Sequence, residues 1–368
     1  MPILVEDQKI HGTYDVERFL GEGAFAEVYR VNHRFLGRQA IKVFKRVGMT
    51  LNDIEEVLGE AKLLSRIAHP NIVRVYDANV LESPQGVRGY FTMEYVAGGS
   101  LDQFWRSYGR IFIPVEETVE IMRQVCGGLS AAHADTPPII HRDIKPQNIL
   151  VGYDEDGLRV RVSDFGLAKQ VNRLTLVASA AGTLAFKPPE TFSSVPADSC
   201  AGDVWALGVT LYLLLTDQLP HQIDRELGWS NKKSFEKQPS LPSELNGNVD
   251  TSLEEIVLCC LEVNQKNRFP TAKELLAALE VWQRHAPIRE GRPKQEPTSE
   301  IFKSVLGMRT PIDQKDAQRL VRAAIKIAEE HGRLSEAADI MEEALNGSPA
   351  LRQKYADKVR LWRSGVSM

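Results

Sequence analysis

The sequence predicts an α+β protein with a small β-rich lobe, a larger helix-rich lobe and an all-α segment at the end. Three observations predict it. Strand-type patterns dominate the first part of the chain, helical patterns dominate the second, and a stretch rich in Pro, Arg and Lys separates a helical tail. We therefore expect an N-terminal extension at 1–13, lobes at 14–95 and 96–285, a linker at 286–300 and a helical domain at 301–368.

The composition is that of an ordinary globular protein. The 368 residues include 45 Lys plus Arg and 49 Asp plus Glu, with 43% hydrophobic residues and a formal charge of −4. This balance favours neither disorder nor a dominant nucleic-acid surface. The start "MPILVEDQKI" reaches acidic residues too early for a secretory signal, and the longest apolar run, at 204–215, is too short to span a bilayer. We expect a cytoplasmic protein without a membrane span.

The first lobe is expected to carry strands at 26–33, 39–45 and 90–96 and a helix at 51–68. A glycine turn, "LGEGAFAEVYRV", places Gly21 and Gly23 between two strands. A dinucleotide-binding fingerprint would open into a helix, so that interpretation fails on context. Two interpretations stay open: a plain hairpin turn, or a turn whose backbone amides approach phosphate oxygens.

Strand alternation in "QAIKVF" puts Ala40 and Lys42 on one face of the sheet. A small residue beside a cation suits a flat ring above Ala40 and phosphates near Lys42. Glu60, on the expected helix, is a candidate partner that would hold the Lys42 ammonium in place. An ordinary surface ion pair is the alternative for Lys42 and Glu60.

Two polar segments carry the candidate chemistry. "HRDIKPQNIL" contains Asp143, Lys145 and Asn148, and "VSDFGLA" contains Asp164 at the end of an apolar strand. Asn148 and Asp164 offer oxygen ligands of the kind that Mg²⁺ prefers, usually completed by substrate phosphates. Asp143 would accept or orient a hydroxyl proton, and Lys145 would neutralise charge on a transferring phosphoryl group. Taken alone, the composition of the first segment favours a solvated loop.

In this order the motifs resemble those of the eukaryotic-type (Hanks-type) serine/threonine protein kinases, over residues 14 to 285. The resemblance implies a bilobal protein-kinase fold. It also implies transfer of the γ-phosphoryl group of ATP to protein substrates, with Mg²⁺ as the metal and Mn²⁺ as an alternative. The catalytic residues that it implies are Lys42, Glu60, Asp143 and Lys145, with Asn148 and Asp164 as metal ligands. The nucleotide-binding residues that it implies are Gly21, Gly23, Val28, Ala40, Lys42, Met93 as gatekeeper, the hinge residues Glu94, Tyr95 and Val96, and Leu150.

Later landmarks of the same family also match. In "GTLAFKPPE", Thr183 would lie near the substrate hydroxyl, and Glu190 would pair with Arg268. Asp203 would anchor the catalytic loop from the buried helix. Lys145 together with Thr183 indicates serine or threonine as the acceptor.

Two positions depart from the family pattern. Ala26 replaces the third glycine of the phosphate-covering loop, and Pro188 stands where the activation segment usually has alanine. Neither change removes a charged or metal-binding group, so we expect altered nucleotide affinity at most.

Arg142, immediately before Asp143, suggests control by phosphorylation. In kinases with this arginine, a phosphate on the activation segment is typically gripped by it and by a basic residue, here Lys169. Ser179 aligns with the usual phosphosite, and Thr175 is the second choice. The alternative is that "TLVASAAG" is simply a flexible loop of small residues.

The helical tail resembles the second half of a single tetratricopeptide repeat. The residues that fall at its spacing are Gly332, Ala337, Ala344 and Pro349. One such unit cannot bury its apolar face alone, so we expect a third helix carrying Tyr355 and Trp362. A generic helical hairpin is the alternative. The tail is better suited to recruiting partners or substrates than to chemistry.

A rival hypothesis is a catalytically inactive pseudokinase scaffold that binds partners through its C-terminal helices. Loss of key residues would favour it. The four residues that decide the question are all present: Lys42, Asp143, Asn148 and Asp164.

Overall fold

The protein is described by a computed structural model. It describes residues 2–50, 53–55, 58–83, 86–109, 112–165, 184–192, 198–221, 235, 237–285, 314–331 and 333–366. Within these ranges, the side chains of residues 60, 83, 284, 285, 314, 330 and 331 are not described. The predicted linker at 286–300 therefore lies outside the described residues.

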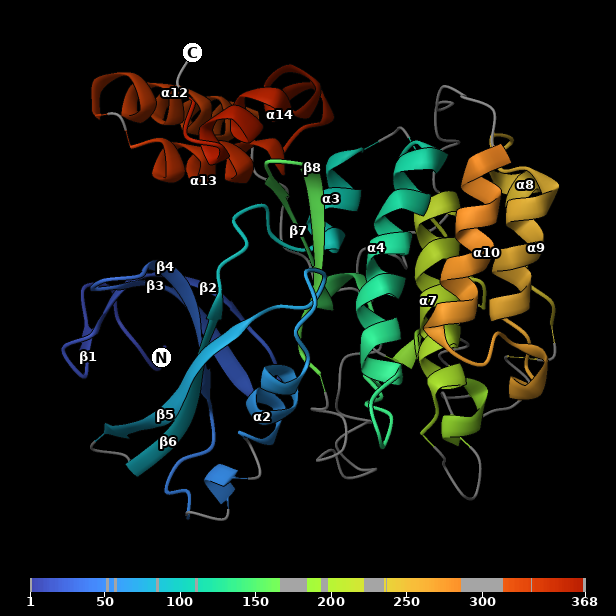
Figure 1. The fold of residues 1–368 in the computed structure, drawn as a ribbon, viewed down its shortest axis with the longest axis horizontal. Helices are drawn as coiled ribbons and strands as arrows, with labels where there is room; N and C mark the ends of the chain where they lie inside the picture. The colour runs from blue at the N-terminus through green and yellow to red at the C-terminus, as the bar shows by residue number, and fades with distance from the viewer. Residues whose placement is uncertain are drawn as a thin grey trace.

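The first lobe is built on a six-stranded antiparallel sheet with the order β1-β2-β3-β4-β6-β5 (Figure 1). Its strands are β1 (Lys9–Ile10), β2 (Tyr14–Glu22), β3 (Ala26–His33), β4 (Gly37–Phe44), β5 (Val75–Ser83) and β6 (Gly86–Glu94). Helix α2 (Gly59–Arg66) lies beside this sheet. Alternation along β3 buries Tyr29 and Val31 in one cluster of the sheet, as expected for a half-buried strand.

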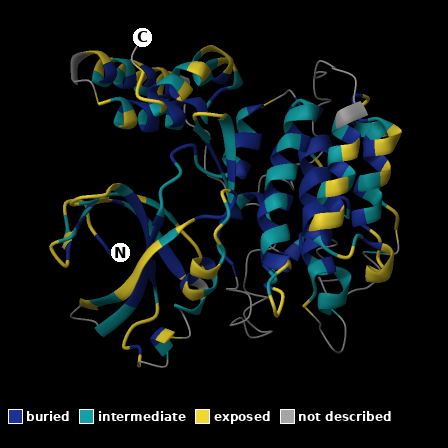
Figure 2. Ribbon diagram, in the orientation of Figure 1, coloured by how far each residue is buried: buried dark blue, intermediate teal, exposed yellow. Residues whose placement is uncertain are grey.

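The second lobe is mainly helical. Its helices are α3 (Leu101–Ser107), α4 (Val115–His133), α7 (Cys200–Thr216), α8 (Pro242–Leu245), α9 (Thr251–Cys260) and α10 (Ala272–His285). A hairpin of β7 (Ile149–Asp154) and β8 (Gly157–Val162) faces the first lobe. Figure 2 shows that the helices around α7 hold most of the buried residues of this lobe.

Helix α7 is mostly apolar, and all of its residues from 203 to 216 are buried. Ser199 caps its start, because its side chain accepts a hydrogen bond from the backbone N–H of Gly202. Asp217 ends it in the left-handed conformation, with φ of 58°. The expected buried helix is therefore confirmed. No helix among the described residues is long and apolar enough to cross a membrane.

The two lobes join between β6 and α3, at the Gly98–Gly99 pair. A Cβ on Gly98 would lie 2.2 Å from the carbonyl oxygen of Val151 in β7, so only glycine permits this close approach. Gly99 has a φ of +80°, and its carbonyl oxygen accepts a 2.8 Å hydrogen bond from the backbone N–H of Val151. The connection is thus fastened to the second lobe.

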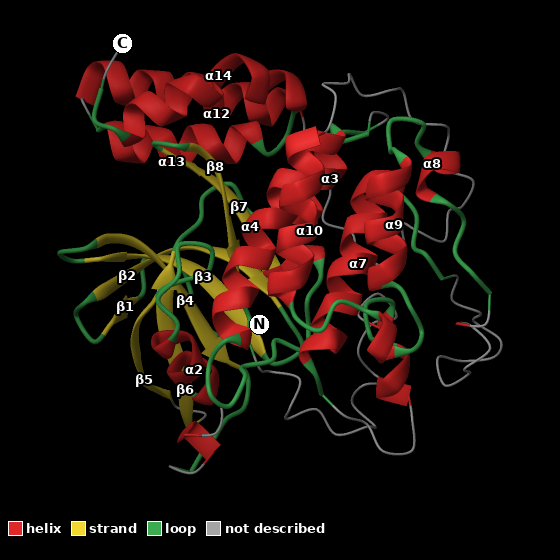
Figure 3. Cartoon of the chain, turned by 45° about the vertical axis from the view of Figure 1, so that its right-hand side comes forward, coloured by secondary structure: helices red, strands yellow, loops and turns green. Residues whose placement is uncertain are grey.

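The chain ends in three helices: α12 (Gln314–His331), α13 (Leu334–Leu345) and α14 (Pro349–Arg363). They lie over the β7–β8 hairpin and beside the first lobe in both views of the chain (Figures 1 and 3). Their own core includes Ala337, Ala344 and Trp362, with Tyr355 packed against it. The expected third helix is confirmed, while Gly332 lies outside the described residues.

Candidate active site

A cavity of about 690 Å³ lies between the two lobes. One part of its lining is apolar and comes from both lobes. Ala40 of β4 pairs directly with Met93 of β6, and both line the cavity. Val28 and Leu150 line it too and pack against the same apolar cluster. These side chains form two apolar surfaces that could accept a flat ring.

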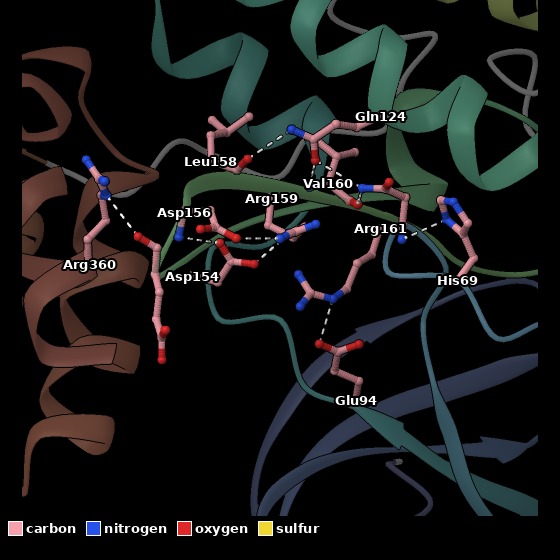
Figure 4. A network of polar contacts seen from close by, with 12 residues as sticks. His69, Glu94, Gln124, Asp154, Asp156, Leu158, Arg159, Val160, Arg161 and Arg360 are labelled. Atoms are coloured by element: carbon pink, nitrogen blue, oxygen red, sulfur yellow. Dashed lines mark hydrogen bonds and ion pairs between the residues drawn. The ribbon is translucent and has the colours of Figure 1, made fainter. Parts of the chain in front are cut away.

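The segment after β6 forms another wall of the cavity. Glu94, Tyr95 and Val96 all line it. The backbone N–H of Glu94 donates to the carbonyl oxygen of Arg74 at 2.8 Å. Its carboxylate lies 2.6 Å from Nε of Arg161 on β8, as Figure 4 shows. Burial raises the pKa of Glu94, and the charge of Arg161 opposes that rise.

A charged group lies at the other part of the cavity. Nζ of Lys42 donates to Oδ1 of Asp164 at 2.6 Å, and Asp164 lines the cavity with Gly21 and Gly23. The Lys42 side chain is only 4% exposed. Burying an ammonium group is costly unless it is paired, and the carboxylate of Asp164 provides that pairing. Glu60 belongs to α2, but its side chain lies outside the described residues, so its pairing with Lys42 stays a prediction.

The loop before β7 gathers a second charged group. Nζ of Lys145 lies 2.7 Å from Oδ2 of Asp143. Nδ2 of Asn148 donates to the backbone carbonyl of Asp143 at 2.7 Å and to Oδ2 at 3.0 Å. Pro146 starts a single 3₁₀ turn that ends at Asn148, which brings the two side chains together.

The donor set fits Mg²⁺. Because the Asn148 amide nitrogen is used by Asp143, its amide oxygen is left to act as an acceptor or ligand. The carboxylate of Asp164 and this oxygen both come from residues that line the cavity. No three His, Cys, Asp or Glu side chains gather as a metal site in the described part of the chain. An ion at the oxygens of Asn148 and Asp164 would be held by few protein ligands and completed by substrate phosphates.

Lys187 also belongs to this site, although no role for it could be predicted from the sequence. It is 7% exposed. Its Nζ donates to the carbonyl oxygen of Arg142 at 2.6 Å and to Oδ1 of Asp143 at 3.2 Å. Burial alone would raise the pKa of Asp143, but Lys145 and Lys187 together hold that pKa well below its usual value. The one sequence feature that could have indicated this role is the presence of a lysine in the otherwise apolar stretch "LAFKPP".

Asp203 supports this loop from α7. Its two carboxylate oxygens accept the backbone N–H groups of His141 at 2.7 Å and Arg142 at 2.8 Å. Arg142 has a φ of 70°, and Asp164 has a φ of 63°. Such conformations are strained for residues with a side chain and persist only where surrounding contacts hold them. The predicted anchoring by Asp203 is confirmed.

The predicted pair of Glu190 and Arg268 is also confirmed. The guanidinium of Arg268 donates to both carboxylate oxygens of Glu190, each at 2.8 Å. Its side chain has no exposed surface and stacks over Trp205 with 4.9 Å to the ring centre. This pair holds the segment after Lys187 against the helical lobe.

Most of the chain is similar to a known protein family. The model described as "protein kinase domain" matches residues 14–279. The chain belongs to the protein kinase domain family. The bilobal fold expected from the sequence is therefore that of this family, of mixed α+β class.

Curated relatives of this protein kinase domain carry serine/threonine kinase names. A probable serine/threonine-protein kinase of Clostridium acetobutylicum is 32% identical over 273 residues, covering 72% of this chain and 39% of the relative. The serine/threonine-protein kinase PknB of Mycobacterium leprae is 30% identical over 289 residues, covering 77% of this chain and 44% of the relative. The chain thus spans about two fifths of the length of these relatives.

A solved structure is similar as well. The crystal structure of the Mycobacterium tuberculosis PknI kinase domain aligns with a TM-score of 0.56 and 25% sequence identity. The alignment covers 76% of this chain and 99% of that one.

The predicted regulatory residues are only partly described. Nε of Arg142 lies 2.6 Å from Oδ2 of Asp198. The other predicted residues of the activation segment lie outside the described residues, namely Lys169, Thr175, Ser179 and Thr183.

Proposed function

We propose that this chain is a serine/threonine protein kinase that transfers the γ-phosphoryl group of ATP to Ser or Thr hydroxyls of protein substrates. One observation carries the proposal. A single cavity joins the apolar surfaces of Ala40, Met93 and Leu150 to the charged end at Asp164. A purine ring suits the first part, and a metal-bound triphosphate suits the second.

Each charged residue has a role that its contacts support. Lys42 would meet phosphate oxygens while Asp164 fixes its ammonium. Bound Mg²⁺, held by Asn148 and Asp164, would supply charge neutralisation at the phosphates. Asp143 is ionised because two lysines lower its pKa, so it can accept a hydrogen bond from a substrate hydroxyl. Lys145, 2.7 Å from that carboxylate, would neutralise the transferring group.

Two observations support serine or threonine as the residue that accepts the phosphoryl group. Lys145, in the catalytic loop, together with Thr183, is typical of serine/threonine kinases. The named relatives are serine/threonine-protein kinases of bacteria. We propose serine or threonine on that basis.

Autophosphorylation with labelled ATP and Mg²⁺ tests the proposal, with Asp164→Ala as the inactive control. Label on serine or threonine in the wild type and none in the variant is the expected result. Nucleotide binding without transfer to itself or to a generic acceptor such as myelin basic protein would favour the inactive scaffold.

We also propose control by phosphorylation of Ser179, or of Thr175 as second choice. Arg142 holds Asp198 at 2.6 Å, and a phosphate would compete with that carboxylate for the same guanidinium. Phosphopeptide mapping after incubation with ATP is the test. Modification at other positions alone would contradict it.

The division of the chain into domains, and the role of its C-terminal helices, are also proposals. We propose the lobe limits 14–95 and 96–285 and a tetratricopeptide-like domain at 301–368 that recruits partners or substrates in the cytoplasm. The three terminal helices and their shared core support the last of these. A pull-down with the full chain, compared with variants of exposed residues on α12, is the corresponding experiment.

A further inference from the structure

The C-terminal helices are fastened to the first lobe by charged side chains. NH1 of Arg18, on β2, lies 2.5 Å from Oε1 of Glu343 on α13. NH1 of Arg38, on β4, lies 3.1 Å from Oδ2 of Asp339 on the same helix. The Arg38 and Asp339 side chains are 18% and 12% exposed, so this second pair is largely shielded from water.

The same helices are fastened to the second lobe. Arg352 of α14 is 5% exposed. Its guanidinium donates to Oγ of Ser107 at 2.8 Å and lies over the rings of Phe104 and Tyr108, at 4.3 and 4.7 Å from their centres. Farther along α14, Arg360, labelled in Figure 4, donates to the carbonyl oxygen of Glu155, which lies between β7 and β8.

Two glycines allow α13 to approach the junction of the lobes. A Cβ on Gly152 of β7 would lie 3.2 Å from Oε2 of Glu342. A Cβ on Gly99 would lie 2.7 Å from Nδ2 of Asn346. Gly99 lies three residues after Val96, the last residue of the cavity wall described above. The end of α13 is therefore packed against the junction between the lobes.

This position brings α13 into the cavity itself. Glu343 and Asn346 line the same cavity as Met93, Leu150 and Asp164. Arg18 of β2, the partner of Glu343, lines the cavity beside it and also donates to the hydroxyl of Tyr95 at 3.3 Å. The mouth of the cleft is thus made by three parts of the chain.

From this arrangement we infer that α13 is a third wall of the nucleotide site, which the magnesium complex of ATP contacts through Glu343 and Asn346. The inference rests on the proposed kinase function. It adds residues from outside the matched kinase domain, which ends at residue 279. It also couples nucleotide binding to docking of the helices, because Arg18 and Glu343 belong both to the cavity and to the link between the parts.

Coupling of this kind is reciprocal. If the docked helices strengthen nucleotide binding, bound nucleotide must strengthen docking by the same factor. Breaking the pair of Arg18 and Glu343 should therefore weaken nucleotide binding. An ion pair of this exposure supports an effect of about three- to fivefold in Kd.

The test is a double-mutant cycle in the full chain. The Kd of the magnesium complex of a non-hydrolysable ATP analogue is measured for the wild type, Arg18→Met, Glu343→Gln and the double variant. Each single change is expected to weaken binding about three- to fivefold. The double variant should bind no more weakly than the single variant with the higher Kd. Arg322→Met, an exposed arginine on α12, is the matched control and should bind as the wild type does.

Asn346→Ala provides a second variant that breaks no ion pair, and it should also weaken binding. Hydrogen exchange gives the reciprocal measurement: nucleotide should slow exchange within α13 of the wild type. Binding within twofold of wild type in all variants, or unchanged exchange in α13, would overturn the inference while leaving the kinase proposal intact. A wild type that binds no nucleotide would overturn both.

Discussion

Nζ of Lys187 lies 3.2 Å from Oδ1 of Asp143, while Nζ of Lys145 lies 2.7 Å from Oδ2 of the same carboxylate. The candidate catalytic aspartate is therefore held between two ammonium groups. Because Lys187 also donates to the carbonyl oxygen of Arg142, it connects the activation segment to the catalytic loop. We interpret Lys187 as a positioning residue for Asp143.

Lys187→Met should lower kcat by about tenfold, because a chain of similar length would remain while Oδ1 of Asp143 loses its ammonium partner. KM for ATP should change little, since Lys187 contacts the loop rather than the nucleotide cavity. Initial rates at saturating peptide substrate measure both. Lys187→Arg should retain part of the activity, because it keeps a donor and a positive charge.

Lys273→Met serves as the matched control for that experiment. Lys273 is exposed on α10, so its loss should leave kcat unchanged. A kcat for Lys187→Met within twofold of the wild type would show that Lys187 has no part in positioning Asp143.

Asp164→Asn should raise the Mg²⁺ concentration needed for half-maximal rate by about tenfold or more. The amide keeps an oxygen near Lys42 but removes the negative charge that a hard cation prefers. Initial rates at fixed ATP and increasing Mg²⁺ report this value. Asp143→Asn is the comparison: it should lower kcat by about a hundredfold and leave the Mg²⁺ requirement unchanged. An equal Mg²⁺ requirement for both variants would contradict the assignment of Asp164 as the ligand.

Much of the fold could be predicted because each element carries a local signal. Alternation identified the strand with Ala40 and Lys42, and the all-apolar run at 204–215 identified the buried helix. The order of the motifs also predicted that Glu190 pairs with Arg268 and that Asp203 anchors the catalytic loop. What could not be predicted depends on distance in space: the contact of Lys187 with Asp143 requires the activation segment to fold back onto the catalytic loop.

The contacts of the terminal helices show the same limit. In the sequence, Glu343 and Asn346 are ordinary polar residues of a predicted helix. No local pattern indicates that Glu343 contacts Arg18. Only packing of α13 on the junction of the lobes brings Glu343 within 2.5 Å of Arg18. This part of the site therefore depends on how distant segments pack together, which the helix propensity of the terminal residues does not indicate.

Arg268→Lys should destabilise the fold by about 3 kcal/mol, although the charge is kept. The guanidinium donates to both oxygens of Glu190 and to the carbonyl oxygen of Glu262, the latter at 2.6 Å. An ammonium cannot reproduce this planar set of donors. Urea unfolding followed by tryptophan fluorescence measures the loss. Arg322→Lys, at an exposed position, should differ from wild type by less than about 0.5 kcal/mol; a similar value for Arg268→Lys would mean that the pair contributes little.

Glu342 gives the terminal helices a pH-dependent stability. It is 2% exposed, and burial raises its pKa to about 7, even though Arg363 lies 2.7 Å away and opposes the rise. Arg363 is shared with Asp339 at 2.6 Å, so one guanidinium serves two carboxylates. Because the pKa in the folded state is above its ordinary value of 4.5, the folded state holds the proton more tightly than the unfolded chain does.

It follows that stability from this group is greatest below about pH 4.5 and is lost as the pH rises to about 7. Glu342→Gln keeps the size of the side chain and cannot ionise. The difference in free energy of unfolding, variant minus wild type, should therefore become more positive between pH 5 and pH 8, by on the order of 1 to 3 kcal/mol. Thermal unfolding at both pH values, with Glu329→Gln at an exposed site of α12 as the control, measures it. A difference that stays constant with pH would show that Glu342 is ionised across the whole range.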